Sequence, residues 1–175
     1  MKATVLITLV AFSMMSLAMA GTPSPGMDQL LRQYYSIHKS LASDSVNGVA
    51  ASAAEIAKIS HQAAGTETQV KAQLIALSDT AAKFNAADLK SARNGFGDLS
   101  DKLIAYLKAS GSKTNPPYQF YCSMVKRNWL QPDRATHNPY YGKSMLTCGE
   151  LVQSEKANEQ KMNNMPMDEP MGHHH

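Results

Sequence analysis

Apolar residues recur every three or four positions through much of the chain, the spacing that places them on one face of an α-helix. Four such stretches follow one another, over about residues 27–42, 44–65, 66–84 and 85–111. Helices of this length with short links predict an all-α fold, an antiparallel four-helix bundle. The residues expected to face its core are Leu30, Tyr34, Ile37, Leu41, Val46, Val49, Ala53, Ile56, Val70, Leu74, Leu77, Ala81, Phe84, Leu89, Ala92, Phe96, Leu99, Leu103 and Tyr106.

Local signals predict where these helices begin and end. Gly65 and Gly111 are placed to end the second and fourth helices, because glycine adopts the left-handed conformation of a C-terminal cap without a Cβ clash. Gly95 and Gly97 lie inside the fourth helix, each costing about 1 kcal/mol relative to alanine, and indicate a kink or a close contact. The expected N-terminal caps are Asp44 or Ser45, the pair Thr66 and Gln69 as a capping box, and Asn85.

The pattern changes at Pro116 and Pro117, because two prolines cannot continue a helix. Residues 115–150 then form what we call the cap, a loop-rich segment with aromatic side chains at short intervals and repeated Pro and Gly. It is too irregular for a core of its own, so we expect it to pack across the bundle through Trp129, Tyr140 and Tyr141. A short helix is expected at 151–160.

The N-terminus matches a secretory signal peptide over residues 1–20. Lys2 precedes an apolar run at 3–17, and small residues stand at Ala18 and Ala20 before the expected cleavage site. Residues 21–26 are rich in Pro, Gly and Ser and are expected to be an exposed segment. The bundle and cap would then occupy 27–160 as one domain, and a tail follows at 161–175. This organisation predicts a periplasmic protein that is not inserted in the membrane after cleavage.

Composition excludes one class of partner. The chain has 17 Lys and Arg against 14 Asp and Glu, a formal net charge of +3, and 43% hydrophobic residues. The basic residues are scattered rather than gathered in a stripe with aromatic residues between them. A nucleic-acid-binding surface is therefore not expected.

Four short motifs in the cap resemble one known family. They are residues 121–124 (YCSM), 129–131 (WLQ), 138–142 (NPYYG) and 145–149 (MLTCG), with weaker agreement upstream at 34–35, 41–44 and 93–100. Together they are similar to the bacterial family called domain of unknown function 3347. That family occurs alone in the periplasm and at the C-terminus of adaptor subunits of heavy-metal efflux pumps. The family usually has Pro where this chain has Ser123.

The resemblance implies copper or heavy-metal handling, with an RND-type efflux adaptor as a partner. The residues of the cap suit this chemistry, because thiolate and thioether sulfur select Cu(I) over hard cations. The candidate ligands are Cys122, Met124, Met145 and Cys148, with His137 nearby in the sequence.

A disulfide is the competing interpretation of the two cysteines. Cysteines of a secreted protein usually pair, and a Cys122–Cys148 bond would contribute ~3.5 kcal/mol in the chain-entropy description. It would also remove both thiolates from metal binding. The sequence leaves both interpretations open, including alternation between them with redox state.

The tail is a second candidate for metal binding. Thioethers bind Cu(I), and clustered imidazoles bind Cu(II) or Zn(II). The three terminal histidines could instead belong to an appended affinity tag. The candidate tail ligands are Met162, Met165, Met167, Met171, His173, His174 and His175.

Enzymatic signatures are missing from the sequence. It contains no Cys-x-x-Cys, no glycine-rich phosphate loop and no His-Glu-x-x-His, although a Cys122–His137 pair could form only in the fold. We therefore expect a non-enzymatic periplasmic protein that buffers copper or another heavy metal, or passes it to an efflux system. The alternative is an interaction module that docks on an efflux adaptor or another envelope partner, with the disulfide as a structural bond.

Overall fold

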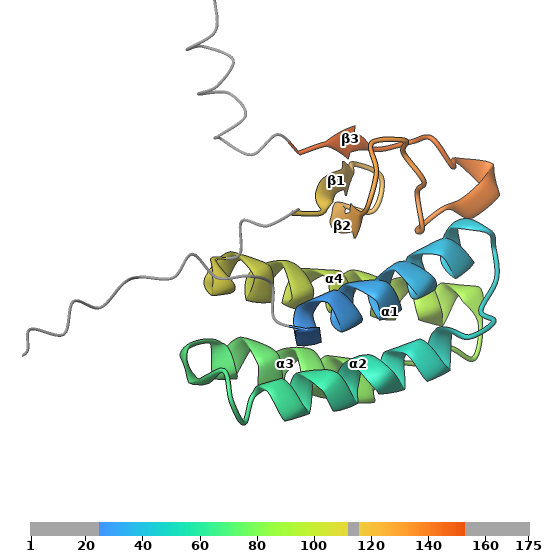
Figure 1. The fold of residues 1–175 in the computed structure, drawn as a ribbon. Coiled ribbons are helices and arrows are strands. Elements are labelled where there is room, and N and C mark those ends of the chain that lie inside the picture. Colours follow the sequence, from blue (N-terminus) through green and yellow to red (C-terminus); the bar gives the residue numbers. More distant parts are fainter. Residues whose placement is uncertain (1–24, 112–115, 153–175) are drawn as a thin grey trace, which may run out of the picture.

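A computed structural model of the chain describes residues 25–111 and 116–152. The predicted signal peptide and the tail at 161–175 lie outside these residues. Figure 1 shows the helices in two layers, with α2 and α3 on one side of α1 and α4, and the strands lying over α1 and α4 on the other side. The helices are α1 (Pro25–Ala42), α2 (Val49–Ala63), α3 (Lys71–Ala82) and α4 (Leu89–Ser110), with 3₁₀ turns η1 (Thr68–Val70) and η2 (Gly142–Ser144).

The strands correct the predicted fold class. A sheet of β1 (Tyr118–Cys122), β2 (Arg127–Gln131) and β3 (Glu150–Leu151) has the order β2-β1-β3, and both pairs are antiparallel. The fold is therefore mixed α/β, and the prediction of an all-α four-helix bundle with a loop-rich cap is wrong. The reason lies in the aromatic residues of the cap, which suit a pleated, half-buried surface and alternate between buried and outward positions in β1.

The predicted core faces of the helices are confirmed. In α1 the side chains of Leu30, Tyr34, Ile37 and Leu41 are at most 1% exposed. The predicted positions in the other three helices are also buried, apart from Val46, Phe84 and Leu89, which are half-buried and pack against the same core. The helix periodicity therefore determined which side of each helix faces inward.

The N-terminal caps differ from the prediction. Gly48 precedes α2 without a side-chain cap, and Asp88 rather than Asn85 caps α4, with Asp88 Oδ1 accepting the Ser91 N–H at 2.8 Å. The Thr66 hydroxyl donates to a carbonyl of the preceding helix, so the predicted capping box is not formed. The C-terminal cap at Gly111 is confirmed, with a left-handed φ of 63°. Short polar residues are frequent in these links, and sequence alone did not select among them.

Two glycines inside α4 allow close packing. A Cβ at Gly95 would lie 3.3 Å from the Phe84 ring, and one at Gly97 would lie 3.2 Å from Arg127 Nε. Arg127 of β2 therefore crosses the surface of α4 at Gly97, where its guanidinium pairs with Asp98 and Asp101. These glycines mark close contacts of the helix, one of the two outcomes that their positions predicted.

The sheet is joined to the helices by buried hydrogen bonds. The Tyr34 hydroxyl of α1 accepts the Leu130 N–H of β2 at 3.1 Å and pairs with the Ser100 hydroxyl of α4 at 2.7 Å. The Tyr34 ring stacks on Phe96 with a centroid distance of 4.9 Å. As a result the cap and the helices share one core, as expected for a segment that packs across them.

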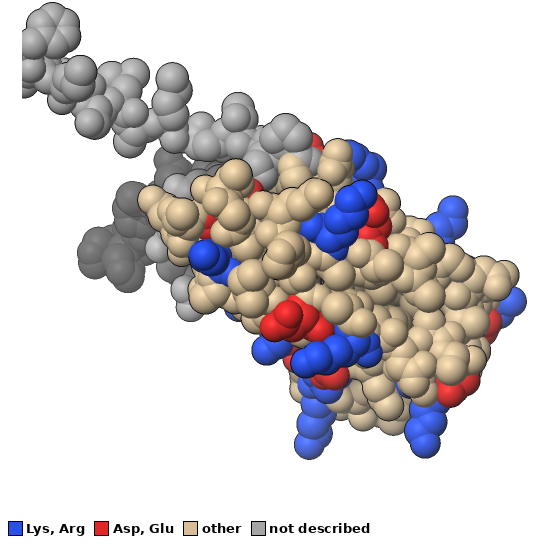
Figure 2. Space-filling view, turned by 90° about the horizontal axis from the view of Figure 1, so that it is seen from below, with Lys and Arg blue, Asp and Glu red and all other residues tan. Residues whose placement is uncertain are grey.

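Charges are dispersed on the face seen from below in Figure 1, on the side of α2 and α3. Figure 2 shows Lys and Arg interspersed there with Asp and Glu, separated by wide uncharged areas. Among the helices in the described part of the chain, none combines the length and apolar character that a membrane-crossing segment needs.

Candidate sulfur site

The two cysteines lie at the two ends of the cap and are unbonded. Cys122 is the last residue of β1, on the inward side of that strand, and is fully buried. Cys148 precedes β3 and is half-buried, with its N–H donating to the Met145 carbonyl at 3.0 Å. Because β3 pairs with β1 through Tyr121 and Glu150, the sheet brings the two cysteine-bearing segments together.

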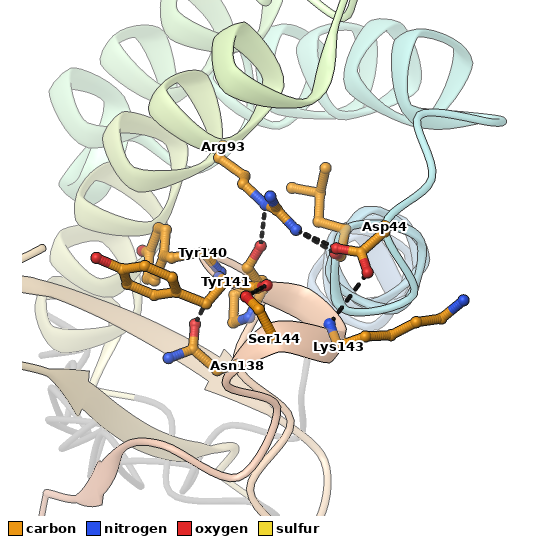
Figure 3. Close-up of polar contacts among 9 residues, drawn as sticks. Asp44, Arg93, Asn138, Tyr140, Tyr141, Lys143 and Ser144 are labelled. Atoms are coloured by element: carbon orange, nitrogen blue, oxygen red, sulfur yellow. Dashed lines mark hydrogen bonds and ion pairs between the residues drawn. The ribbon is translucent and has the colours of Figure 1, made fainter. Parts of the chain in front are cut away.

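The side chain of Asn138 joins both segments. This residue is fully buried, and its Nδ2 donates to Cys122 Sγ at 3.4 Å and to the Cys148 carbonyl at 2.7 Å. Its Oδ1 accepts the backbone N–H groups of Tyr140 at 2.8 Å and Tyr141 at 3.3 Å. Figure 3 shows the side chain of Asn138 directed at the backbone of Tyr140 and Tyr141. Asn138, which the sequence indicated only as part of the motif at 138–142, therefore links the Cys122 sulfur to the backbone of Cys148.

The remaining predicted ligands are placed differently. Met145 is half-buried and one hydrogen-bonded turn from Cys148, whereas Met124 lies in the β1–β2 turn and is 60% exposed. His137 is exposed, and its backbone carbonyl accepts a hydrogen bond from His38. In residues 25–111 and 116–152, no group of three or more His, Cys, Asp and Glu side chains is placed to hold a metal ion. His137 therefore does not form such a group with the two cysteines.

The loop between β2 and β3, which contains Asn138, is held against the helices by the ion pair of Arg93 and Asp44, shown in Figure 3. Arg93 of α4 donates to the Pro139 carbonyl at 3.0 Å and to Asp44 Oδ1 at 2.6 Å. Asp44 Oδ2 accepts the Lys143 N–H at 3.1 Å, so the hydrogen bond to Arg93 and that to Lys143 lower the pKa of Asp44. Gly142 has a φ of 56°, and a Cβ there would collide with Asp44 Oδ1.

His38 supports the same loop from α1. Its Nε2 lies 2.7 Å from the His137 carbonyl, and because a carbonyl only accepts, this nitrogen must carry the proton. His38 is 6% exposed, and burial lowers its pKa to about 4 despite this hydrogen bond. The histidine is therefore neutral at physiological pH. It has a structural role, because it holds the His137 carbonyl from the interior.

Cys122 belongs to the same buried cluster as Phe120, Trp129 and Tyr140. Trp129 is fully buried, stacks on Phe120 at a centroid distance of 5.2 Å, and donates from Nε1 to Gln131 Oε1 at 2.9 Å. Burial is the main cause that raises the pKa of Tyr140, and Cys122 is among the smaller causes. The predicted packing roles of Trp129 and Tyr140 are confirmed, and Tyr141 is half-buried and packs against the same core.

Comparison with protein-family models gave no match, and neither curated protein sequences nor solved structures resemble the chain significantly. The resemblance of the cap to domain of unknown function 3347 therefore stays a prediction from the quoted residues.

Sequence reasoning found the sulfur residues but not the residues that hold their segments. Asn138, Arg93 and Asp44 all lie within stretches that supported the resemblance, and Asp44 was also a candidate helix cap, but no signal indicated their contacts with the cap. His38 lies outside those stretches, and its contact with the loop could not be predicted from helix periodicity.

Proposed function

We propose that this protein binds monovalent copper in the periplasm and buffers it or passes it to a heavy-metal efflux system. The observation that supports the proposal most is the joining of two unbonded cysteine segments by one buried side-chain amide. Metal-binding side chains are commonly oriented by such outer partners, which hold the ligand in place before the metal arrives.

The type of donor favours copper over zinc. Structural zinc sites use four ligands, mostly from Cys and His. The described part of the chain offers no cluster of three such residues or carboxylates. Soft sulfur donors select Cu(I), and the cap provides two thiols and two thioethers.

The four sulfur residues have separate roles in this proposal. Cys122 and Cys148 provide the thiolates, and Met145 adds a thioether next to Cys148. Met124, exposed in the β1–β2 turn, is suited to the first contact with an incoming ion or to its release. The auxiliary tail collects further ions with weaker affinity.

The compartment and partner rest on sequence. The signal-peptide pattern at residues 1–20 supports export, and the family resemblance supports association with an RND-type efflux adaptor. A role in buffering needs only reversible binding, whereas delivery needs docking on the adaptor.

Anaerobic titration of the full chain with Cu(I) against a competing chelator tests the proposal. We expect one tight site that Cys122→Ser or Cys148→Ser weakens by orders of magnitude, because each substitution removes a thiolate. Met124→Leu is the matched control and should have a much smaller effect, because its side chain is largely exposed. Unchanged affinity in Cys148→Ser would exclude the cap as the copper site.

A free-thiol count on protein from an oxidising compartment separates the proposal from the interaction-module alternative. Two free thiols are expected for the copper-binding form. If no thiol is free, and copper binds only after reductant is added, the disulfide is the resting state and the interaction module becomes the better description.

A further inference from the structure

The orientation of the Asn138 amide is fixed by its surroundings. Two backbone N–H groups, of Tyr140 and Tyr141, face one end of the amide and can only donate, so this end must be Oδ1. The Cys148 carbonyl faces the other end and can only accept, so this end must be Nδ2. The second proton of Nδ2 is then directed at Cys122 Sγ. The sulfur of Cys122 is therefore held as a hydrogen-bond acceptor.

The backbone of Asn138 is fixed equally well. Its N–H donates to the Leu146 carbonyl at 2.7 Å, and its carbonyl accepts the Gly142 N–H at 3.0 Å. Neighbouring bonds from His38 to the His137 carbonyl and from Arg93 to the Pro139 carbonyl hold the residues on either side. The amide is thus presented to the sulfur by both α1 and α4, and it cannot turn away without breaking several of these bonds.

From this geometry we infer that Asn138 is the positioning residue of the Cys122–Cys148 pair. It keeps the two segments together and gives Cys122 Sγ an N–H donor, and this inference rests on the proposed copper function. A sulfur that carries negative charge, as a metal-bound thiolate does, accepts a hydrogen bond more strongly than a neutral thiol. The amide therefore stabilises the metal-bound form more than the free form.

The substitution Asn138→Asp tests this role with almost no change in size. One carboxylate oxygen can still accept from Tyr140 and Tyr141, but the other replaces a donor with an acceptor opposite Cys122 Sγ and the Cys148 carbonyl. We expect the affinity of the full chain for Cu(I), measured against a competing chelator, to fall roughly 10–100-fold. Asn128→Asp is the matched control, because it makes the same change in β2, where Gln119 can still donate to the side chain.

A readout that needs no metal tests the contact itself. In proton–nitrogen correlation spectra of the apoprotein, Cys122→Ala should shift one of the two side-chain amide protons of Asn138 and leave the other, bonded to the Cys148 carbonyl, nearly unchanged. Adding Cu(I) to the unsubstituted chain should shift the same proton. An asparagine that does not contact Cys122 Sγ would show neither selective shift, and the measurement remains decisive if Asn138→Asp does not fold.

The outcomes separate the two proposals. If the unsubstituted chain binds Cu(I) tightly and Asn138→Asp binds equally well, the positioning role is wrong and the copper function stands. If the unsubstituted chain does not bind Cu(I), the copper function is wrong. Equal small shifts of both amide protons in Cys122→Ala would overturn the positioning role whether or not copper binds.

Discussion

At the scale of single residues, three buried polar side chains determine how the cap is held. Tyr34, His38 and Asn138 each contact a backbone group or a side chain that lies far away in the sequence. A buried polar group without a partner costs about 1–3 kcal/mol, so these contacts strongly favour one arrangement of the cap over others. A few polar contacts within an apolar core therefore determine the position of the cap on the helices.

The buried His38 predicts a dependence of stability on pH. Its folded-state pKa of about 4 lies below its ordinary value of 6.5, so between these values the unfolded chain binds a proton that the folded chain does not. The free energy of unfolding should therefore be highest above pH 6.5 and fall by up to about 3 kcal/mol as the pH is lowered toward 4. Chemical denaturation at a series of pH values measures this change.

Two glutamine variants provide the control. Glutamine at position 38 can still donate to the His137 carbonyl but cannot be protonated, so His38→Gln should reduce the loss of stability in this range. His61→Gln changes an exposed histidine of α2 and should keep the full loss. Equal pH profiles for His38→Gln and the unsubstituted chain would show that this histidine is not the responsible group.

At the scale of elements, the loop between β2 and β3 is attached to the helices at Pro139 and Lys143, next to η2. Asp44 follows α1, Arg93 belongs to α4, and both contact backbone groups of this loop. Gly142 is the point of closest approach, because a Cβ there would meet the Asp44 carboxylate. The loop consequently depends on glycine at this position for two separate reasons, its left-handed backbone and the absence of a side chain.

Alanine substitution at two glycines separates these reasons. Gly111 and Gly142 both have left-handed φ angles, but a Cβ at Gly111 would have no neighbour within 4 Å among residues 25–111 and 116–152. Gly111→Ala should cost about 1–2 kcal/mol of stability from the backbone alone. Gly142→Ala should cost clearly more, because the Asp44–Arg93 pair must also move, and thermal unfolding of the two variants measures the difference. Equal costs would mean that the collision with Asp44 is relieved without loss.

The elements also show why the helices were easier to predict than the sheet. Each helix repeats its inward positions over three or more turns, whereas β1 and β2 have five residues each and β3 has two. Such short strands contain few alternations, and Leu151, expected in a helix, becomes a strand residue only by pairing with Phe120. Prolines and glycines between the strands made the whole segment look irregular.

At the scale of the whole molecule, the proposed copper function has two parts with different expected strength. In this proposal the cap binds copper through cysteine thiolates, whereas the tail at 161–175 offers methionine thioethers and histidines. We expect removal of residues 153–175 to lower the number of copper ions bound per chain and to leave the affinity of the tightest site unchanged. Copper content after equilibrium dialysis measures the number, and chelator competition measures the affinity.

A matched variant identifies which tail residues are responsible. Replacing His173, His174 and His175 by alanine in the full chain should remove the Cu(II) sites and keep the Cu(I) sites of the tail methionines. If removal of 153–175 abolished the tightest site, the cap would not be the principal copper site.

The sequence by itself determined which face of each helix is buried, because helical periodicity is a local property repeated along the chain. It also determined which residues bring sulfur chemistry to the cap. Only the tertiary structure decided that the cap contains a sheet, and that Asn138 lies against Cys122, 16 residues away, while His38 holds a carbonyl 99 residues away. These contacts join segments whose patterns are independent of one another. The physical reason is that a hydrogen bond requires two groups to be close in space. Local propensity determines the conformation of each segment, but it does not determine which segments come into contact.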